Sequence, residues 1–110
     1  MATLQAPSYT AKYEPIINQL EFIAGVIAGR PTKLSTINAN CGSELEYVGQ
    51  IKHTATLLRA RCGPGNKTHM YYLDMVINGM ICILTPDIDV DMMAGQVLYM
   101  AASYHRNTLG

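Results

Sequence analysis

The residues with the clearest chemical potential are the basic and aromatic side chains between positions 47 and 73. No acidic residue occurs in this stretch, whereas four basic residues do. Cationic side chains bind phosphate by charge, and tyrosine rings stack on bases. The segment therefore predicts an anion, nucleotide or nucleic-acid site made of Lys52, Arg59, Arg61, Lys67, Tyr71 and Tyr72. The competing interpretation is a solvated helix face, with the tyrosines in the core or at an interface.

Methionine and tyrosine are concentrated in the last third of the chain. Six of the seven methionines and four of the seven tyrosines lie at or after position 70. Methionine fills irregular core gaps and also forms adaptable binding surfaces, and a surface low in charge but rich in these residues is typical of protein interfaces. The pattern predicts self-association through an interface containing Met92, Met93, Met100, Tyr99 and Tyr104.

The cysteines offer one candidate nucleophile. Cys41, Cys62 and Cys82 are 21 and 20 positions apart, which matches neither a disulfide framework nor a pair of metal-binding C-x-x-C motifs. Cys41 comes just before an expected helix N-terminus, where the helix dipole can lower the pKa of a thiol. A small enzyme with Cys41 as nucleophile is therefore an alternative, although no catalytic residue, metal ligand or cofactor is assigned.

Two further segments resemble ligand-binding motifs but lack residues that those motifs require. The segment from Gly63 to Thr68 resembles a phosphate-binding P-loop, but Asn66 separates the lysine from the glycine and the segment follows a helix. Asp87, Asp89 and Asp91 alternate like calcium ligands, but Met92 stands where an EF-hand needs glycine. A turn between helices and an acidic helix start explain the two segments.

Composition predicts one globular domain, 1–110, with an N-terminal arm over 1–12. Only 15% of the residues are charged and 49% are hydrophobic, which excludes intrinsic disorder. Eight acidic residues balance eight basic ones, but the charges are segregated, because residues 74–104 contain four aspartates and no lysine or arginine. Since the chain shows neither a signal peptide nor a membrane span, we expect a cytoplasmic protein without membrane partners.

The first half of the chain predicts two amphipathic helices. Apolar residues recur at helical steps from Tyr13, with Pro15 in the first turn and Gly29 as the stop. A connector from 30 to 42 follows, with a possible short edge strand over 32–38. Ser43 and Glu46 form a capping box that starts the second helix, which we expect to end near Arg61.

The sequence of the segment 69–85 is compatible with two secondary structures. As a hairpin, it turns at Asn78-Gly79 and pairs Leu73 with Leu84 on one apolar face. As a helix, it carries an apolar stripe at steps of three and four. Because glycine inside a helix costs about 1 kcal/mol and the segment is rich in β-branched residues and tyrosine, the sequence favours the hairpin.

The remaining residues complete the predicted fold. Thr85, Pro86 and Asp87 have the pattern of a helix start, and the last helix should end near Arg106. The expected fold class is α+β, mainly helical, with two helices, a hairpin over about 69–85 and a C-terminal helix. The alternative is an all-α four-helix bundle.

The leading functional hypothesis is a small protein without catalytic activity that acts by protein–protein binding. It would be a homo-oligomeric accessory or inhibitor protein, and a virus-encoded protein fits this size and lack of motifs. The alternative is the anion, nucleotide or nucleic-acid binding module of the basic 47–73 segment. No cofactor is expected in either case.

Overall fold

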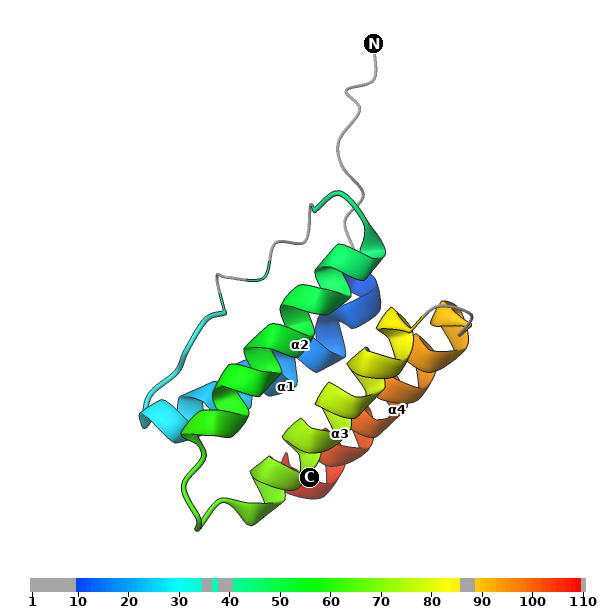
Figure 1. Ribbon diagram of the computed structural model, residues 1–110. Helices are drawn as coiled ribbons and strands as arrows, with labels where there is room; N and C mark the ends of the chain where they lie inside the picture. Colours follow the sequence, from blue (N-terminus) through cyan, green and yellow to red (C-terminus); the bar gives the residue numbers. More distant parts are fainter. Residues whose placement is uncertain (1–9, 35–36, 38–40, 86–88, 110) are drawn as a thin grey trace.

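Four helices make up the part of the chain that the structure describes. The computed structural model describes residues 10–34, 37, 41–85 and 89–109. The helices are α1 (Thr10–Ala28), α2 (Glu44–Arg61), α3 (Lys67–Leu84) and α4 (Val90–Leu109) (Figure 1). No strand occurs in these described ranges. The all-α alternative therefore fits, and the α+β fold class is wrong.

The helices form a closed bundle in which three of them run in the same direction. Each helix contacts two others, in the order α1, α2, α3, α4 and back to α1. Figure 1 shows that α1, α2 and α4 run from one end of the bundle to the other, whereas α3 runs back. The parallel arrangement of α1 and α2 requires the connector 29–43 to return along the bundle. The described residues of the segment 32–38 within this connector form no strand.

The core is apolar and contains three fully buried tyrosines. Tyr13, Tyr47 and Tyr104 are each at most 2% exposed. The largest buried aliphatic side chains come from all four helices: Ile16, Leu20, Ile23, Val48, Ile51, Leu73, Met80, Ile83 and Val97. Within α1, α2 and α3 they are three, four or seven residues apart, so they lie on one side of each helix, as an amphipathic helix requires.

The ends of α1 partly confirm the prediction. The helix begins at Thr10 rather than Tyr13, so Pro15 lies inside it and the predicted arm is shorter than 1–12. The predicted stop is confirmed: Gly29 has a φ of 76°, and the backbone N–H of Arg30 donates to the carbonyl of Gly25 at 3.0 Å. This is a Schellman motif, in which the left-handed residue is usually glycine.

The predicted capping box of α2 is confirmed for Ser43 and corrected for Glu46. The Glu46 N–H donates to the Ser43 hydroxyl at 3.1 Å. The Glu46 carboxylate accepts from the backbone N–H of Gly42 at 3.2 Å, one residue before the donor expected in a standard capping box.

The predicted hairpin over 69–85 is wrong, because α3 is continuous through Asn78 and Gly79. Gly79 is buried, and a Cβ atom added there would lie 2.2 Å from Cγ2 of Val97 on α4. The glycine therefore allows close approach of two helices and does not form a turn. Leu73, Val76, Met80 and Ile83 make the buried stripe of the helix.

The start of α4 also differs from the prediction. Thr85 ends α3, because its N–H donates to the carbonyl of Cys82 at 3.1 Å and its hydroxyl donates to the carbonyl of Ile81 at 2.9 Å. The N-cap of α4 is Asp89, whose carboxylate accepts from the N–H of Met92 at 3.0 Å. Pro86 and Asp87 lie outside the described residues.

Candidate protein-binding face

The outer surface shared by α3 and α4 carries the most exposed large apolar side chains of the described chain. Tyr99 is 70% exposed, Tyr71 59% and Met92 56%. On each helix, exposed and half-buried positions on this side follow steps of four, three and four. We call this surface the α3/α4 face; it consists of Tyr71, Met75, Asn78 and Cys82 of α3 and Met92, Gln96, Tyr99 and Ser103 of α4.

A small hollow lies within this face, between the start of α3 and the second half of α4. It has a volume of about 200 Å³ and is lined by Tyr71, Tyr72, Met75, Tyr99, Met100 and Ser103. The rings of Tyr71 and Tyr72 are nearly perpendicular, with centroids 5.3 Å apart. The hollow therefore brings together two tyrosines from the predicted anion site and two residues from the predicted interface.

The α3/α4 face is uncharged along most of its length. Neither residues 75–84 nor residues 92–104 contain an acidic or basic side chain. Within 71–82, the charged residue Asp74 lies between Tyr71 and Met75, and its half-exposed side chain pairs with Arg59 of α2. The other charges stand beyond the ends of the face: Lys67 precedes Tyr71 by one helical turn, and Asp89 precedes Met92 by three residues. Both are exposed. Because α3 and α4 are antiparallel, Lys67 and Asp89 stand at opposite ends of the bundle (Figure 1).

A row of aromatic contacts supports the face from inside. Tyr72 packs against the buried Tyr104 with ring centroids 4.1 Å apart, and His69 shares a hydrogen bond with the Tyr104 hydroxyl. Phe22 of α1 packs edge-on against His69 at 6.1 Å between centroids. Burial lowers the pKa of His69. Tyr71 of the face packs against Tyr72 and is thus connected through this row to rings of α1, α3 and α4.

The basic residues of the predicted anion site do not gather at the hollow. Arg59 of α2 donates from Nε to the Asp74 carboxylate of α3 at 2.9 Å. Lys52 is half-buried on α2, and Arg61 and Lys67 are exposed. Only Lys67 stands on the helix that carries Tyr71 and Tyr72. The acid-free and base-free segments thus meet through the Arg59–Asp74 ion pair.

The five residues of the predicted interface have different environments. Met92 and Tyr99 are exposed, Met93 and Met100 are half-buried, and Tyr104 is 1% exposed in the core. Five further residues of the face were not predicted from the sequence to belong to a site: Met75, Asn78, Cys82, Gln96 and Ser103. The repeated steps of four, three and four on 71–82 and 92–103 would have identified them if 69–85 had been taken as a helix.

The candidate nucleophile Cys41 is buried. It is 4% exposed, and its sulfur donates to the carbonyl of Ser43 at 3.1 Å. A buried thiol that bonds to a backbone carbonyl acts as a small apolar core residue. Within the described ranges, no group of three potential metal ligands occurs, and Cys41, Cys62 and Cys82 are free thiols.

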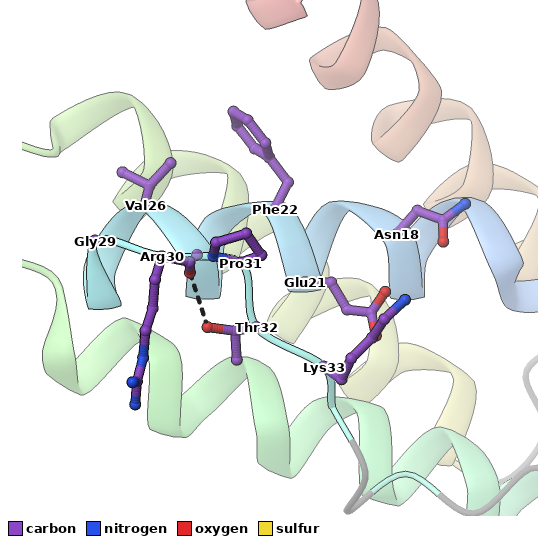
Figure 2. Close-up of a pocket in the computed structure, with 10 residues that line it drawn as sticks. Asn18, Glu21, Phe22, Val26, Gly29, Arg30, Pro31, Thr32 and Lys33 are labelled. Carbon is purple, nitrogen blue, oxygen red and sulfur yellow. Dashed lines mark hydrogen bonds between the residues drawn. The ribbon is translucent and has the colours of Figure 1, made fainter.

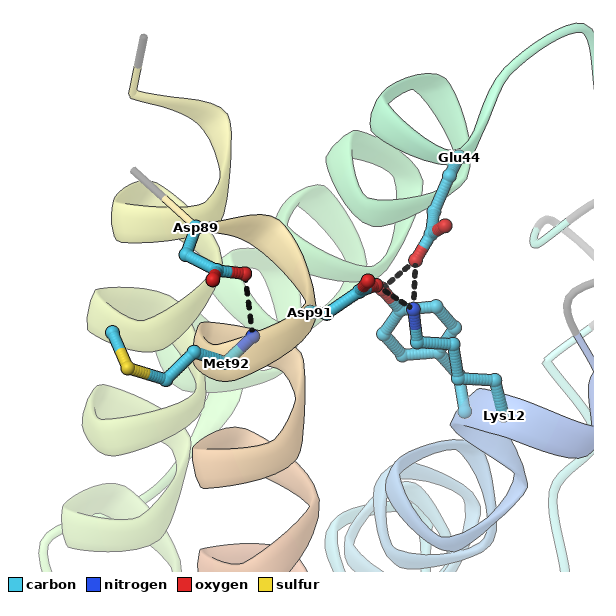
Figure 3. A network of polar contacts seen from close by, with 6 residues as sticks. Lys12, Glu44, Asp89, Asp91 and Met92 are labelled. Carbon is cyan, nitrogen blue, oxygen red and sulfur yellow. Dashed lines mark hydrogen bonds and ion pairs between the residues drawn. The ribbon is translucent and has the colours of Figure 1, made fainter. Parts of the chain in front are cut away.

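A polar network ties three helix N-termini together at one end of the bundle (Figure 3). Lys12 of α1 donates to Glu44 of α2 at 2.7 Å and to Asp91 of α4 at 3.0 Å. The Tyr13 hydroxyl donates to the same Glu44 oxygen at 2.6 Å. Burial and the neighbouring carboxylate raise the pKa of Tyr13, and the bond to Glu44 raises the pKa of Lys12. These groups are mutually satisfied, so the network is structural.

A larger groove of about 670 Å³ lies between α1 and the connector after it (Figure 2). Its lining combines Phe22 and Val26 with the charged residues Glu21, Arg30 and Lys33. Figure 2 shows Phe22 and Val26 extending from α1 away from the connector. The Glu21 carboxylate accepts from the backbone N–H of Leu34 at 3.2 Å, which fixes the connector.

Comparisons with protein-family models, with curated proteins and with solved structures found no match for this chain. Among the described residues, no helix is both long enough and apolar enough to cross a membrane.

Proposed function

We propose that this protein acts without catalysis, by protein–protein binding, as a homo-oligomer that associates through the α3/α4 face. The observation that carries the proposal is the exposure of Tyr71, Met92 and Tyr99 on an uncharged surface formed by two neighbouring helices. Tyrosine and methionine are enriched at interfaces, where charge is depleted.

The size of the face suits an interface. Eighteen helical residues extend about 27 Å, and neighbouring helices lie about 10 Å apart. Two such helices therefore present a surface on the order of the roughly 800 Å² that each partner buries in a standard complex. As a small binding protein, the chain would serve as an accessory or inhibitor protein. Its free thiols suit a cytoplasmic location.

The test is sedimentation of the purified protein from low to high micromolar concentration, with Tyr99→Glu and Leu57→Glu as matched variants. Leu57 is 47% exposed on α2, away from the face. We expect the native chain and Leu57→Glu to associate equally. Tyr99→Glu should weaken association about 10-fold to 100-fold, as loss of an interface tyrosine commonly does. A native chain that stays monomeric throughout would overturn the proposal.

The hollow supports a second candidate function, the binding of an anionic aromatic ligand such as a nucleotide. Two perpendicular tyrosine rings offer a stacking surface, and Lys67 on the same helix could contact a phosphate group. Tyrosine fluorescence titration with nucleotides at low salt should then show binding that weakens in Tyr71→Ala and in Lys67→Ala. Lys52→Ala, which changes a basic residue on α2, is the control. Absence of binding at low salt would remove this candidate.

A further inference from the structure

We infer that the second copy lies antiparallel across the α3/α4 face, in a closed dimer whose two-fold axis passes close to Asn78 and Tyr99. This inference depends on the proposed self-association and adds the orientation of the partner. A two-fold contact uses the same patch on both chains. The face must therefore be complementary to itself in one of two orientations, with the helices of the two copies either parallel or antiparallel.

The charges at the ends of the face favour the antiparallel orientation. Lys67 marks one end, and Asp89 marks the other. An antiparallel partner places its Asp89 end over the Lys67 end of the first copy, twice in each dimer. A parallel partner would bring the two Lys67 ends together and the two Asp89 ends together. Opposed like charges at an interface are unfavourable.

The C-terminus of α3 adds to this complementarity. It lies at the Asp89 end of the face, and a helix C-terminus carries a partial negative charge. In the antiparallel dimer, Lys67 therefore approaches both the partner's α3 C-terminus and the partner's Asp89. Lys67 in turn neutralises the negative end of that helix.

The middle of the face determines where the axis passes. Gly79 of α3 lies level with Val97 of α4, so the centre of the eight residues of the face falls near Asn78 on α3 and near Tyr99 on α4. In the antiparallel dimer, the Asn78 residues of the two chains lie close to each other. A parallel partner places α3 over the partner's α4, which separates the two Asn78 residues by about the distance between neighbouring helices, roughly 10 Å.

Cysteine cross-linking distinguishes these arrangements, because a disulfide requires Cα atoms within about 7 Å of each other. The background carries Cys62→Ser and Cys82→Ser to remove the half-buried thiols. In that background, Asn78→Cys should form a covalent dimer under mild oxidation, whereas Lys67→Cys, at the end of the face, should form no covalent dimer. Circular dichroism confirms that each variant is helical before oxidation.

Charge variants provide an independent measurement of the orientation. Lys67→Glu should weaken dimerisation roughly fivefold to tenfold, since it places like charges together at two equivalent contacts. Asp89→Asn, which keeps a good helix cap while removing the charge, should weaken it by a smaller factor. Lys52→Glu on α2 is the matched control and should change nothing.

The outcomes separate the orientation from the association itself. A dimer that Tyr99→Glu dissociates, but in which Asn78→Cys does not cross-link, overturns the antiparallel arrangement and leaves the proposed function standing. A dimer that Lys67→Glu leaves unchanged also overturns it, because Lys67 would then not face the partner's Asp89 end. A chain that sediments as a monomer at every concentration overturns both proposals.

Discussion

Glu44 is the residue on which the polar end of the bundle depends. One of its oxygens accepts from both the Tyr13 hydroxyl and the Lys12 ammonium group. Its side chain is 26% exposed, whereas that of Asp91, the other partner of Lys12, is 88% exposed. Ion pairs in open solvent contribute little to stability, whereas a partly buried carboxylate that accepts from a buried hydroxyl contributes more.

Glu44→Gln should therefore lower the free energy of unfolding by about 1–3 kcal/mol, the range for hydrogen bonds to a charged group. Asp91→Asn, which removes the exposed half of the network, should change it by less than about 1 kcal/mol. Urea denaturation of the two variants measures the difference. Equal losses of unfolding free energy in the two variants would contradict the larger contribution expected from Glu44.

His69 gives the fold a pH dependence of predictable sign. It is half-buried, packs against Phe22 and shares a hydrogen bond with Tyr104. Burial lowers its pKa in the folded state, so the unfolded chain, with a pKa near 6.5, binds more protons at mildly acidic pH. By linkage, this contribution to stability is fully present above about pH 6.5 and is lost as the pH falls towards the folded-state value.

We expect the urea concentration at the midpoint of denaturation to decrease as the pH is lowered from about 7 to about 5. The decrease should be proportional to the fraction of the unfolded-state histidine that becomes protonated. His69→Gln, which can still bond to Tyr104, should flatten this slope. His53→Gln, at an exposed position on α2, is the control and should leave the slope unchanged. A slope that survives His69→Gln would assign the pH dependence to other groups.

At the scale of the elements, the contact between Gly79 and Val97 fixes how closely α3 and α4 pack. Val97 is fully buried and stiff at χ1, so it cannot move aside for a new methyl group. Gly79→Ala should lower the free energy of unfolding by about 1–3 kcal/mol, the cost of overpacking a core, despite the higher helix propensity of alanine.

A double-mutant cycle tests the cause. In a Val97→Ala background, the clashing methyl group is absent, and Gly79→Ala should instead stabilise the protein by up to about 1 kcal/mol through helix propensity. This reversal of sign, measured by chemical denaturation, isolates the contact between the two positions. If Gly79→Ala destabilises equally in both backgrounds, the steric explanation is wrong.

The same glycine shows why the sequence predicted three helices well and misread the fourth. Local signals fixed the stop at Gly29 and the cap at Ser43, because both act within a few residues. Asn78-Gly79 has the local pattern of a tight turn, and the reason for its glycine lies on another helix, at Val97. Likewise, Thr85 and Asp89 are both good N-cap residues, and the sequence does not show that Thr85 closes α3.

The candidate site was predictable only in part for the same reason. The excess of methionine and tyrosine in the last third indicated an interface, and Met92 and Tyr99 are exposed there. Burial of Tyr104 and the pairing of Arg59 with Asp74 depend on which helices become neighbours. The α3/α4 face itself requires a helical 69–85 segment, so the hairpin interpretation concealed it.

At the scale of the whole molecule, the connector between α1 and α2 determines the topology. Because the two helices are parallel, it must span the length of α2, about 27 Å for 18 residues. Its fifteen residues, 29–43, can reach about 50 Å when extended. A seven-residue connector would reach only about 23 Å, which is too short to keep α1 in place.

Deletion of residues 35–42 should therefore detach α1 and abolish cooperative unfolding. Deletion of residues 38–40 alone leaves twelve residues, about 40 Å of reach, and should preserve the bundle with a modest loss of stability. Insertion of four Gly-Ser residues between 38 and 39 should cost less than about 1 kcal/mol. Thermal unfolding followed by circular dichroism compares the three variants. A cooperative transition in the longest deletion would contradict the parallel arrangement.

The parallel direction of α1, α2 and α4 also gives the molecule an electrical polarity. Helix dipoles that point the same way add, and α3 cancels only one of the three. Each chain therefore carries a net dipole moment along the bundle, equivalent to about two unopposed helices. Two chains placed antiparallel have moments that oppose and cancel, whereas two parallel chains would have moments that add side by side and repel.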